Sequence, residues 1–263
     1  MVELSSQDKL VSHRISRMIK FSKANTKLKK LYEVPALAKW LKGKRKVYSF
    51  DLLSGWACPA ASACKSKVVI ENGKRKIKDG KDMQFRCFSA SQEVVYTNVY
   101  NLRKNNFDAI RSMNSIDEIA TAIQSALPKN AGIVRIHVAG DFFMKSYFAA
   151  WVRIARLNPD ILFYAYTKQL QFMVELIKEF DICPENLVLT ASYGGTYDDY
   201  ISKYNLRTSI VVENEIQASS LDLEVDDDDS HAAIPEWRDK SFALVIHGTQ
   251  PKGRNKIALP ILS

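Results

Sequence analysis

The stretch "IVRIHVAGDFFMKSYFAAWVRIARLNPDILFYAYTK", Ile133 to Lys168, contains a complete strand–helix–strand unit. Its two ends, 133–139 and 161–166, are rich in β-branched and aromatic residues, which is typical of buried strands. Between them, residues 146–157 repeat apolar side chains at helical spacing. A strand, a helix and a second strand in this order indicate two parallel strands joined by a crossover, so the stretch predicts an α/β fold.

The same alternation continues on both sides of this stretch. Further strands are expected at Val47–Leu52, Leu187–Ser192, Thr208–Glu213 and Phe242–His247. Helical patterns lie between most of the strands, at Ser91–Lys104, Ile116–Leu127, Gln169–Phe180 and Tyr197–Tyr204. Six such units are too few for an eight-fold barrel, so we expect a partial, six-unit TIM-like β/α barrel. A doubly wound open sheet is the alternative architecture.

In either architecture, ligands bind at the carboxyl ends of the strands. Polar residues and glycines end every expected strand. The candidate ligand-binding residues at these ends are His137, Asp141, Tyr166, Lys168, Glu213 and His247.

The two-residue period of a strand assigns sides to the residues of 133–139. Val134, Ile136 and Val138 share one side, which we expect to face the helices because it is purely aliphatic. Arg135 and His137 share the other side, which should face the barrel interior.

Cysteines follow the first expected strand closely. Cys58 and Cys64 stand in a loop of small residues, and the run after them contains Asn72-Gly73, a strong signal for a β-hairpin turn. Because a hairpin returns the chain to its starting point, Cys87 should come back beside Cys58 and Cys64. We expect a hairpin insertion that bears these cysteines, in a loop over residues 54–88. Cys183 lies before a later strand, at the opposite edge of the sheet, and is interpreted as a structural thiol.

Three converging thiols indicate a metal site, because a cytosolic protein keeps its cysteines reduced and a disulfide is disfavoured. Structural zinc prefers four ligands in close pairs, whereas the spacing here is C-x5-C-x22-C. An iron–sulfur cluster fits better, with [4Fe–4S] preferred and [3Fe–4S] as the form that lacks one iron. Zinc with a distant histidine remains an alternative.

The net charge of +9 is distributed unevenly. Between Lys9 and Lys46, thirteen Lys or Arg residues stand against one acidic residue, Glu33. We expect residues 1–46 to form a basic helical segment whose apolar stripe packs on the main domain, 47–263. The stripe comprises Val11, Ile15, Met18, Ile19, Leu37 and Trp40. An arm that contacts nucleic-acid phosphates is the alternative.

The opposite extreme of charge is "EVDDDDSH", Glu224 to His231. Like charges repel one another, so we expect a solvated, mobile loop over residues 221–234. The amino-terminal residues lack the pattern of a secretory signal, and no apolar run reaches the ~18 residues of a membrane span. We therefore expect a cytoplasmic protein.

Three segments resemble the phage gene-product-eighty-eight-like domain family: "SGWACPAASACKSK" (54–67), "RCFSASQE" (86–93) and the run from Ile136 to Lys168. The resemblance spans roughly residues 45–170, and its most specific part is "GDFF" with the following Trp151. It implies a viral origin, and hence the cytoplasm of an infected host cell. It also implies that three family cysteines match Cys58, Cys64 and Cys87, but it implies no reaction.

A more distant likeness is to radical S-adenosylmethionine enzymes, which have six-unit partial barrels and three cysteines after the first strand. Ala139-Gly140-Asp141 stands where their glycine-rich acidic motif would lie. Those enzymes typically use C-x3-C-x2-C, which this chain lacks, so the likeness leaves S-adenosylmethionine as an open candidate ligand.

These observations favour an iron–sulfur protein of unassigned role. The cluster could bind a small molecule at an open iron, carry electrons, or be received from host iron–sulfur assembly proteins and passed on. The alternative from another class is a nucleic-acid-binding phage protein that uses the basic segment, with the cysteines as a structural metal clip.

Overall fold

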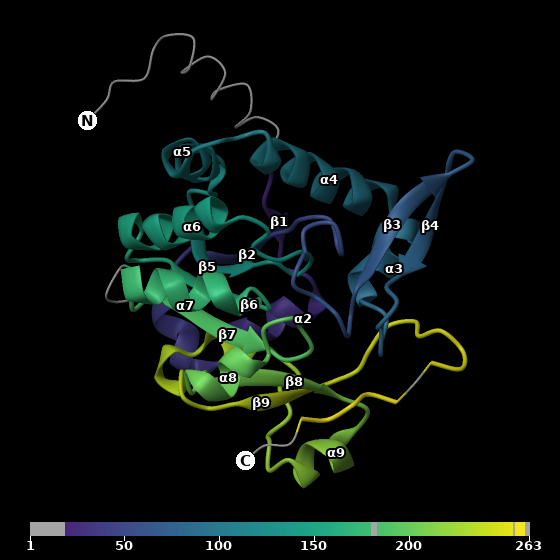
Figure 1. The fold of residues 1–263 in the computed structure, drawn as a ribbon. Helices are drawn as coiled ribbons and strands as arrows, with labels where there is room; N and C mark the ends of the chain where they lie inside the picture. Colours follow the sequence, from purple (N-terminus) through teal and green to yellow (C-terminus); the bar gives the residue numbers. More distant parts are fainter. Residues whose placement is uncertain (1–18, 180–182, 255, 261–263) are drawn as a thin grey trace.

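The structure is a computed structural model and describes residues 19–179, 183–254 and 256–260. Its centre is a seven-stranded sheet that curls into half a barrel (Figure 1). A short β1 (Ser22–Lys23) pairs antiparallel with β2 at one edge. From β2 onward neighbouring strands are parallel and follow chain order: β2 (Lys46–Phe50), β5 (Ala131–Ile136), β6 (Leu162–Thr167), β7 (Leu187–Ser192), β8 (Thr208–Val212) and β9 (Phe242–Val245).

Each expected strand is present, which confirms the mixed α/β fold. The uninterrupted order excludes a doubly wound sheet, because that fold reverses its strand order at a switch point. Chain order is the arrangement that repeated right-handed β–α–β crossovers produce when all the helices lie on one side of the sheet.

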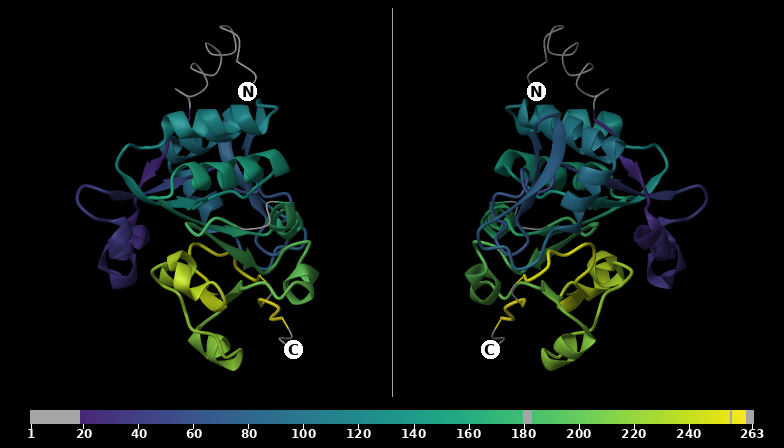
Figure 2. Two further views of the ribbon diagram at one scale, coloured as in Figure 1. Left: turned by 90° about the vertical axis from the view of Figure 1, so that its left-hand side faces the viewer. Right: turned by 90° about the vertical axis from the view of Figure 1, so that its right-hand side faces the viewer.

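Four long helices cover the outer face of the half-barrel (Figures 1 and 2). They are α4 (Thr97–Arg111), α5 (Ile116–Ala126), α6 (Lys145–Leu157) and α7 (Leu170–Glu179). Their apolar stripes meet Phe50, Val134 and Phe163 in one buried cluster that has Trp151 of α6, fully buried, at its centre. The helix expected over 91–104 is instead two helices, α3 (Phe88–Val95) and α4, because Tyr96 between them is extended.

Short helices cover the inner face of the sheet. They are α2 (Thr26–Lys29), η1 (Lys30–Glu33) and η2 (Pro35–Trp40), together with α10 (Ser230–Ala233) and η3 (Pro235–Trp237). Leu28, Leu31 and Leu37 are fully buried against Ile133 and Leu162. The basic segment therefore packs part of its length onto the sheet through leucines.

The expected apolar stripe of the basic segment is only partly within the described residues. Val11, Ile15 and Met18 lie outside them, while Ile19 is buried and Trp40 packs beside Leu37. The basic segment was expected to be helical, but residues 19–21 are not helical, because Ser22 and Lys23 pair with β2.

A hairpin of β3 (Ser66–Glu71) and β4 (Lys74–Asp79) projects from the loop between β2 and α3 (Figure 1). Its turn residues Asn72 and Gly73 have φ of 52° and 72°, the left-handed pair that a tight two-residue turn requires. No cysteine lies on either strand, so the expected cysteine-bearing hairpin is corrected: Cys64 precedes the hairpin and Cys87 follows it.

Two smaller helices complete the fold, α8 (Asp199–Lys203) after β7 and α9 (Glu215–Ser220) after β8. Within the described ranges, every helix is too short or too polar to cross a bilayer.

Candidate functional site

The three cysteines of the loop over residues 54–88, hereafter the cysteine loop, lie at the carboxyl edge of the sheet. Cys58 and Cys64 stand before the hairpin, and Cys87 immediately precedes α3 as its N-cap residue. All three are partly buried free thiols. Burial, then the charge of Asp141 and those of Cys87 and Cys64, raises the pKa of Cys58 well above its ordinary value. The three thiols are thus close enough to influence one another electrostatically.

Cys87 shows the same coupling. Burial, followed by the charge of Cys64, raises the pKa of Cys87 to about 11, although the amide of Ser89 in the first turn of α3 acts in the opposite direction. Three thiolates in this loop would repel one another in a poorly solvated space. A cationic group placed among them would relieve both penalties.

The first arm of the cysteine loop is fastened to the end of β7. The amides of Ser62 and Ala63 both donate to the carbonyl oxygen of Gly194, at 3.2 and 3.0 Å. Gly194 has φ of 96°, and a Cβ there would come within 2.8 Å of the Ala63 Cβ. Glycine at this position and alanine at 63 therefore permit the close contact of two backbones beside the thiols.

A buried ionic network that the sequence analysis missed fastens the two arms of the loop to each other. Ser54, at the start of the loop, donates its amide and hydroxyl to the two carboxylate oxygens of Glu93 in α3, at 3.0 and 2.8 Å. Arg103 of α4 pairs with the same carboxylate at 3.2 Å. Glu93 is fully buried, yet nothing in the sequence marks it, because a glutamate in a helix is ordinarily a surface residue.

Asp141 and Lys168 occupy the ends of β5 and β6 beside the loop. The Asp141 carboxylate accepts hydrogen bonds from the Thr167 hydroxyl at 2.6 Å and the Lys168 amide at 2.9 Å. Burial nevertheless raises the pKa of Asp141. The Lys168 ammonium donates to Ser192 Oγ at 2.8 Å and to the carbonyl oxygens of Ser192 and Tyr193. Asp141, Lys168 and Cys58 are thus brought together.

His137 does not face the barrel interior, so that expectation is wrong. Its φ of 71° lies in the left-handed region, which reverses the alternation of sides after Ile136. The ring packs against Phe142 and shares a hydrogen bond of 2.8 Å with the Tyr147 hydroxyl on the outer, helical face. Val138, expected on the helical face, joins the inner cluster instead. Burial, then the charge of Arg135, lowers the pKa of His137 to about 3.

The remaining three candidates occupy separate surroundings. Tyr166 lies on the inner face, under the guanidinium of Arg135. Glu213, at the end of β8, pairs with Arg254 and accepts the amide of Ile257 at 3.0 Å, so the carboxyl-terminal segment covers it. His247 stacks on Phe88, with ring centroids 4.6 Å apart. Because Phe88 follows Cys87 directly in the chain, this contact places His247 near Cys87. Asp141 is likewise near Cys58, whose pKa its charge raises.

The geometry does not form a site for one bare metal ion. Among the described residues, no group of three or more His, Cys, Asp or Glu side chains is arranged to hold a metal ion. Three sulfurs bound to a single zinc at about 2.3 Å each would lie only about 4 Å apart. The thiolates of a cubane cluster bind different irons and stand farther apart than this.

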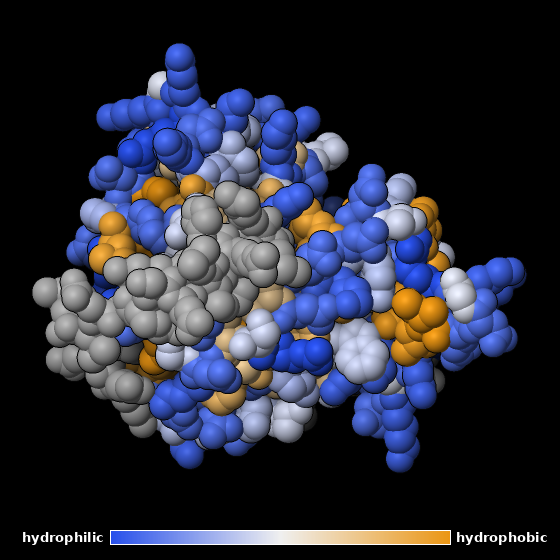
Figure 3. All heavy atoms as spheres, turned by 90° about the horizontal axis from the view of Figure 1, so that it is seen from above, coloured by the Kyte–Doolittle hydropathy of each residue, from blue (hydrophilic) through white to orange (hydrophobic). Residues whose placement is uncertain are grey.

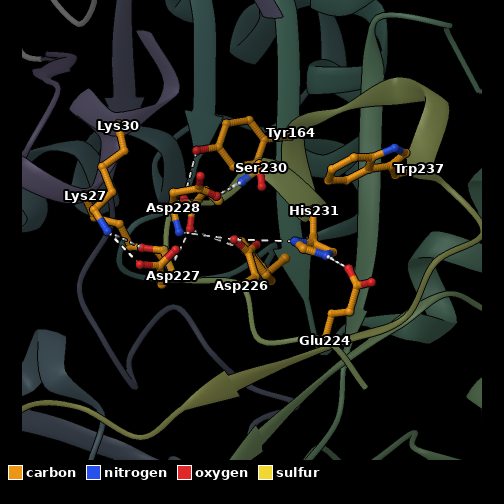
Figure 4. Close-up of polar contacts among 12 residues, drawn as sticks. Lys27, Lys30, Tyr164, Glu224, Asp226, Asp227, Asp228, Ser230, His231 and Trp237 are labelled. Carbon is orange, nitrogen blue, oxygen red and sulfur yellow. Dashed lines mark hydrogen bonds and ion pairs between the residues drawn. The ribbon is translucent and has the colours of Figure 1, made fainter. Parts of the chain in front are cut away.

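The acidic loop, residues 221–234, is not solvated along its whole length, in contrast to the expectation (Figure 4). Asp227 is exposed, but Asp226 and Asp229 are buried on the inner face of the sheet. Asp229 pairs with Arg135 and with Lys27, the latter at 2.8 Å, and accepts the Tyr164 hydroxyl at 2.9 Å. These cations stabilise the carboxylate against its burial, so the pKa of Asp229 falls to about 2.

Two further features lie away from the cysteine loop. Cys183 joins the apolar cluster on the outer face and donates to the Leu187 carbonyl at 3.5 Å, as a structural thiol would. A cavity of about 1060 Å³ opens at the amino edge of the sheet, lined by Trp40, Arg45, Asp160 and Arg238 among others. Neither feature contacts the other three cysteines.

Comparison with known protein families shows which family the chain belongs to. The family model described as "Gene product 88" matches residues 19–259. The chain belongs to the gene product 88 family. The match begins before β1 and ends after β9, so it includes every strand and all three cysteines of the loop.

Two curated relatives are similar over a shorter region. The Gene 88 proteins of Mycobacterium phages L5 and D29 are each 29% identical over 122 residues, which is 43% of this chain. The aligned region covers 44% of the L5 protein and 43% of the D29 protein, so the chain spans less than half the length of either relative. Neither name states an activity. No solved structure matches the chain.

Proposed function

We propose that this member of the gene product 88 family is a phage iron–sulfur protein in which Cys58, Cys64 and Cys87 hold the cluster. The observation that carries the proposal is the mutual electrostatic coupling of three thiols at the carboxyl edge of the sheet. A [4Fe–4S] cluster is the first choice, and a [3Fe–4S] cluster follows from the loss of one iron. When bound, the cluster would supply one-electron transfer or a Lewis-acidic iron.

The surroundings of the thiols support this donor set. The positive charge of the cluster irons would lower the cost of thiolates at Cys58 and Cys87, whose pKa values burial and repulsion raise. The alanines between Cys58 and Cys64 keep side-chain bulk away from the thiols, which leaves room for a cluster. The fastening of the loop to Gly194 and to Glu93 fixes both arms before any cluster binds.

The proposal includes a relation between this half-barrel and the six-unit TIM-like barrel, with the hairpin as an insertion after its first strand. In that architecture, ligands bind above the strand ends where Asp141 and Lys168 lie. Asp141 would orient an amine or hydroxyl of a small ligand, and Lys168 would hold the Ser192–Tyr193 backbone in place. S-adenosylmethionine is one ligand of suitable chemistry.

Three thiolates leave one iron of a cubane without a cysteine. His247 is the candidate for that position, because its ring stacks on Phe88 next to Cys87 and its Nε2 has no hydrogen bond among the described residues. If His247 binds the iron, the protein carries electrons or hands on clusters; if a small molecule binds, the protein is an enzyme. Host assembly proteins would supply the cluster in the cytoplasm of the infected cell.

The decisive test is the metal content of protein purified without oxygen. Cys58→Ala, Cys64→Ala and Cys87→Ala should each lose bound iron, acid-labile sulfide and the brown absorption, whereas Cys183→Ala should retain all three. Cys183 is the matched control because its thiol belongs to the apolar cluster of the outer face. Stoichiometric zinc without sulfide, or equal loss in the Cys183 variant, would overturn the proposal.

The fourth ligand can be assigned by paramagnetic resonance of the reduced cluster. His247→Ala should change the spectrum if His247 binds iron, and should leave it unchanged if the position is open. Adding S-adenosylmethionine to wild-type protein should change the spectrum only in the second case. If neither treatment alters the spectrum, the proposed open iron is absent.

A nucleic-acid-binding protein with a structural metal clip is the second candidate. It is favoured by the exposure of Lys29, Lys42 and Lys44 in the basic segment, whose leucines are buried. Salt-dependent DNA binding that is lost when these lysines are replaced, in protein that contains no sulfide, would favour this function over the first.

A further inference from the structure

The two faces of the β3–β4 hairpin differ sharply in composition. The strands pair residue by residue, and partners across the pair share one face. On one face Val68 and Ile77 turn toward α3, and Arg75 of the same face donates to the Val94 carbonyl at 3.3 Å. The other face carries Lys67, Lys74, Lys76 and Lys78. We call these four residues the lysine face.

The charge of the lysine face is poorly compensated within the chain. Glu71 is the one acidic residue of this face: it forms an ion pair with Lys76 and lies opposite Lys74 in the register, and no ion pair of Lys67, Lys74 or Lys78 occurs in the described part of the chain. Lys67 and Lys78 are direct partners across the two strands, a like-charge pair that destabilises a sheet. The arrangement therefore has a cost in folding that an anionic ligand would remove.

An exposed tryptophan lies at the base of the same face. Trp56 is 45% exposed and donates its indole N–H to the Val68 carbonyl at 2.8 Å. The Lys67 ammonium lies 4.0 Å from the centre of the indole ring. Gly55 passes directly over Lys67, since a Cβ there would come within 2.7 Å of the Lys67 Cβ. The loop backbone thus fixes an aromatic ring beside a row of cations.

Lysines on an edge strand also prevent sheet aggregation, and that role explains outward charge on β4. It does not explain an exposed indole next to the charges, because a large aromatic surface favours association instead of preventing it. Figure 3 shows hydrophilic residues at the outermost part of the molecule on the hairpin side, with smaller hydrophobic patches beside them. The hairpin is therefore accessible to a large, charged partner.

We propose that the lysine face and Trp56 bind single-stranded nucleic acid. Lys74, Lys76 and Lys78 are spaced at about 6.8 Å along β4, so they can contact successive backbone phosphates. The indole of Trp56 stacks on an unpaired base, as aromatic side chains do in proteins that bind single strands. A duplex would offer the phosphates but no free base to the indole, so the single strand is the preferred ligand.

The inference does not depend on the proposed cluster. It rests on the hairpin, whose contacts involve no cysteine side chain. Trp56 and Lys67 nevertheless flank Cys58 and Cys64 in sequence, so a bound strand would lie beside the cysteine loop.

The test is fluorescence anisotropy of a labelled twenty-nucleotide dT strand titrated with the full-length chain at several salt concentrations. Replacing Lys74, Lys76 and Lys78 together by Gln should weaken binding at least tenfold in 0.1 M salt. It should also reduce the slope of log K against log salt by about 2, because each lost phosphate contact contributes about 0.7. Replacing the exposed Lys129, Lys203 and Lys240 by Gln removes the same charge elsewhere and should leave affinity within twofold.

The aromatic contact is tested separately. Trp56→Leu should weaken binding about tenfold with an unchanged salt slope. Tyr96→Leu, at another exposed aromatic residue, should have no effect. Urea unfolding of each variant shows whether the hairpin region stays folded, and an unstable Trp56→Leu is replaced by Trp56→Phe, which should retain most of the affinity.

Three results would overturn the proposal. The first is an equal loss of affinity in the two triple variants. The second is equal affinity for a duplex and a single strand. The third is that polyglutamate displaces the bound strand as effectively as unlabelled dT does. The last result would indicate an acidic protein as the partner.

Discussion

The cysteine loop and the acidic loop are both long connections at the sheet, and they treat their ionisable groups in opposite ways. In the acidic loop, Asp229 is buried with Arg135 and Lys27 as partners, and its pKa falls to about 2. In the cysteine loop, burial and mutual repulsion raise the pKa of Cys87 to about 11. The carboxylate of the first loop meets counter-charges from β5 and α2, whereas the thiols of the second loop have none among the groups that shift their pKa most, so the second loop is suited to receive a cation.

This difference predicts that the acidic loop stabilises the fold and the cysteine loop supports function. Substitutions in the acidic loop should change the free energy of unfolding, while cysteine substitutions should mainly change metal content.

Arg135→Met should lower the free energy of unfolding by about 4 kcal/mol, because it leaves the buried Asp229 without its main counter-charge. Urea unfolding at neutral pH measures the change. Lys30→Met is the control, since the Lys30–Asp227 pair is exposed and its loss should not be measurable. Equal stability of the Arg135 variant and wild type would show that the acidic loop is not a structural part of the sheet.

Glu93→Gln should lower the free energy of unfolding by about 3 kcal/mol, because Arg103 stays buried without a charged partner. It should also raise the rate at which a thiol reagent modifies the cysteines, since Ser54 no longer holds the first arm of the loop to α3. Glu215→Gln, at an exposed position on α9, should alter neither quantity. Unchanged thiol reactivity would mean that the cysteine loop is positioned by its contacts with Gly194 alone.

Asp226→Asn should stabilise the protein by about 2 kcal/mol at pH 7.5 and have little effect at pH 4. Burial, followed by repulsion from Asp229, raises the pKa of Asp226 from 3.8 to about 6. The folded state therefore holds this proton more tightly than the unfolded chain. The resulting stability is present below pH 3.8 and is lost as pH rises through about 6.

The difference in free energy of unfolding between wild type and variant, measured at the same pH, isolates this effect. The pH dependence that His137 contributes through its lowered pKa is common to both proteins and cancels. Asp227→Asn, at the exposed neighbouring position, is the control and should show no such pH dependence. A variant with the same pH dependence as wild type would contradict the assignment to Asp226.

The presence and direction of the six parallel strands, but not their order in the sheet, were predictable from the sequence because most residues of these strands are apolar and buried. Such strands appear as apolar runs such as Ile161–Tyr166, and the helical runs between them require parallel crossovers. The β3–β4 hairpin was also predictable, since Asn72 and Gly73 readily adopt the positive φ that its turn requires.

The sequence-based expectations that proved wrong, and the one residue that was missed, share a cause: the position of each side chain depends on the tertiary structure. His137 changed sides because one residue with positive φ ended the strand alternation, and no local pattern indicates that a histidine adopts this conformation. Asp226 and Asp229 were expected in solvent because their burial depends on Arg135, which lies 94 residues from Asp229 in sequence. Glu93 was missed because its partners Ser54 and Arg103 come from different elements.

The sequence by itself therefore determined the α/β class, the succession of strands and helices, and the edge of the sheet at which the thiols gather. These properties follow from periodicity and turn chemistry, which act over a few residues. The tertiary structure alone decided which charges are buried with partners and which ionisable groups remain uncompensated. That decision depends on contacts between distant segments, because the free energy of a buried charge is set by the groups that packing places around it.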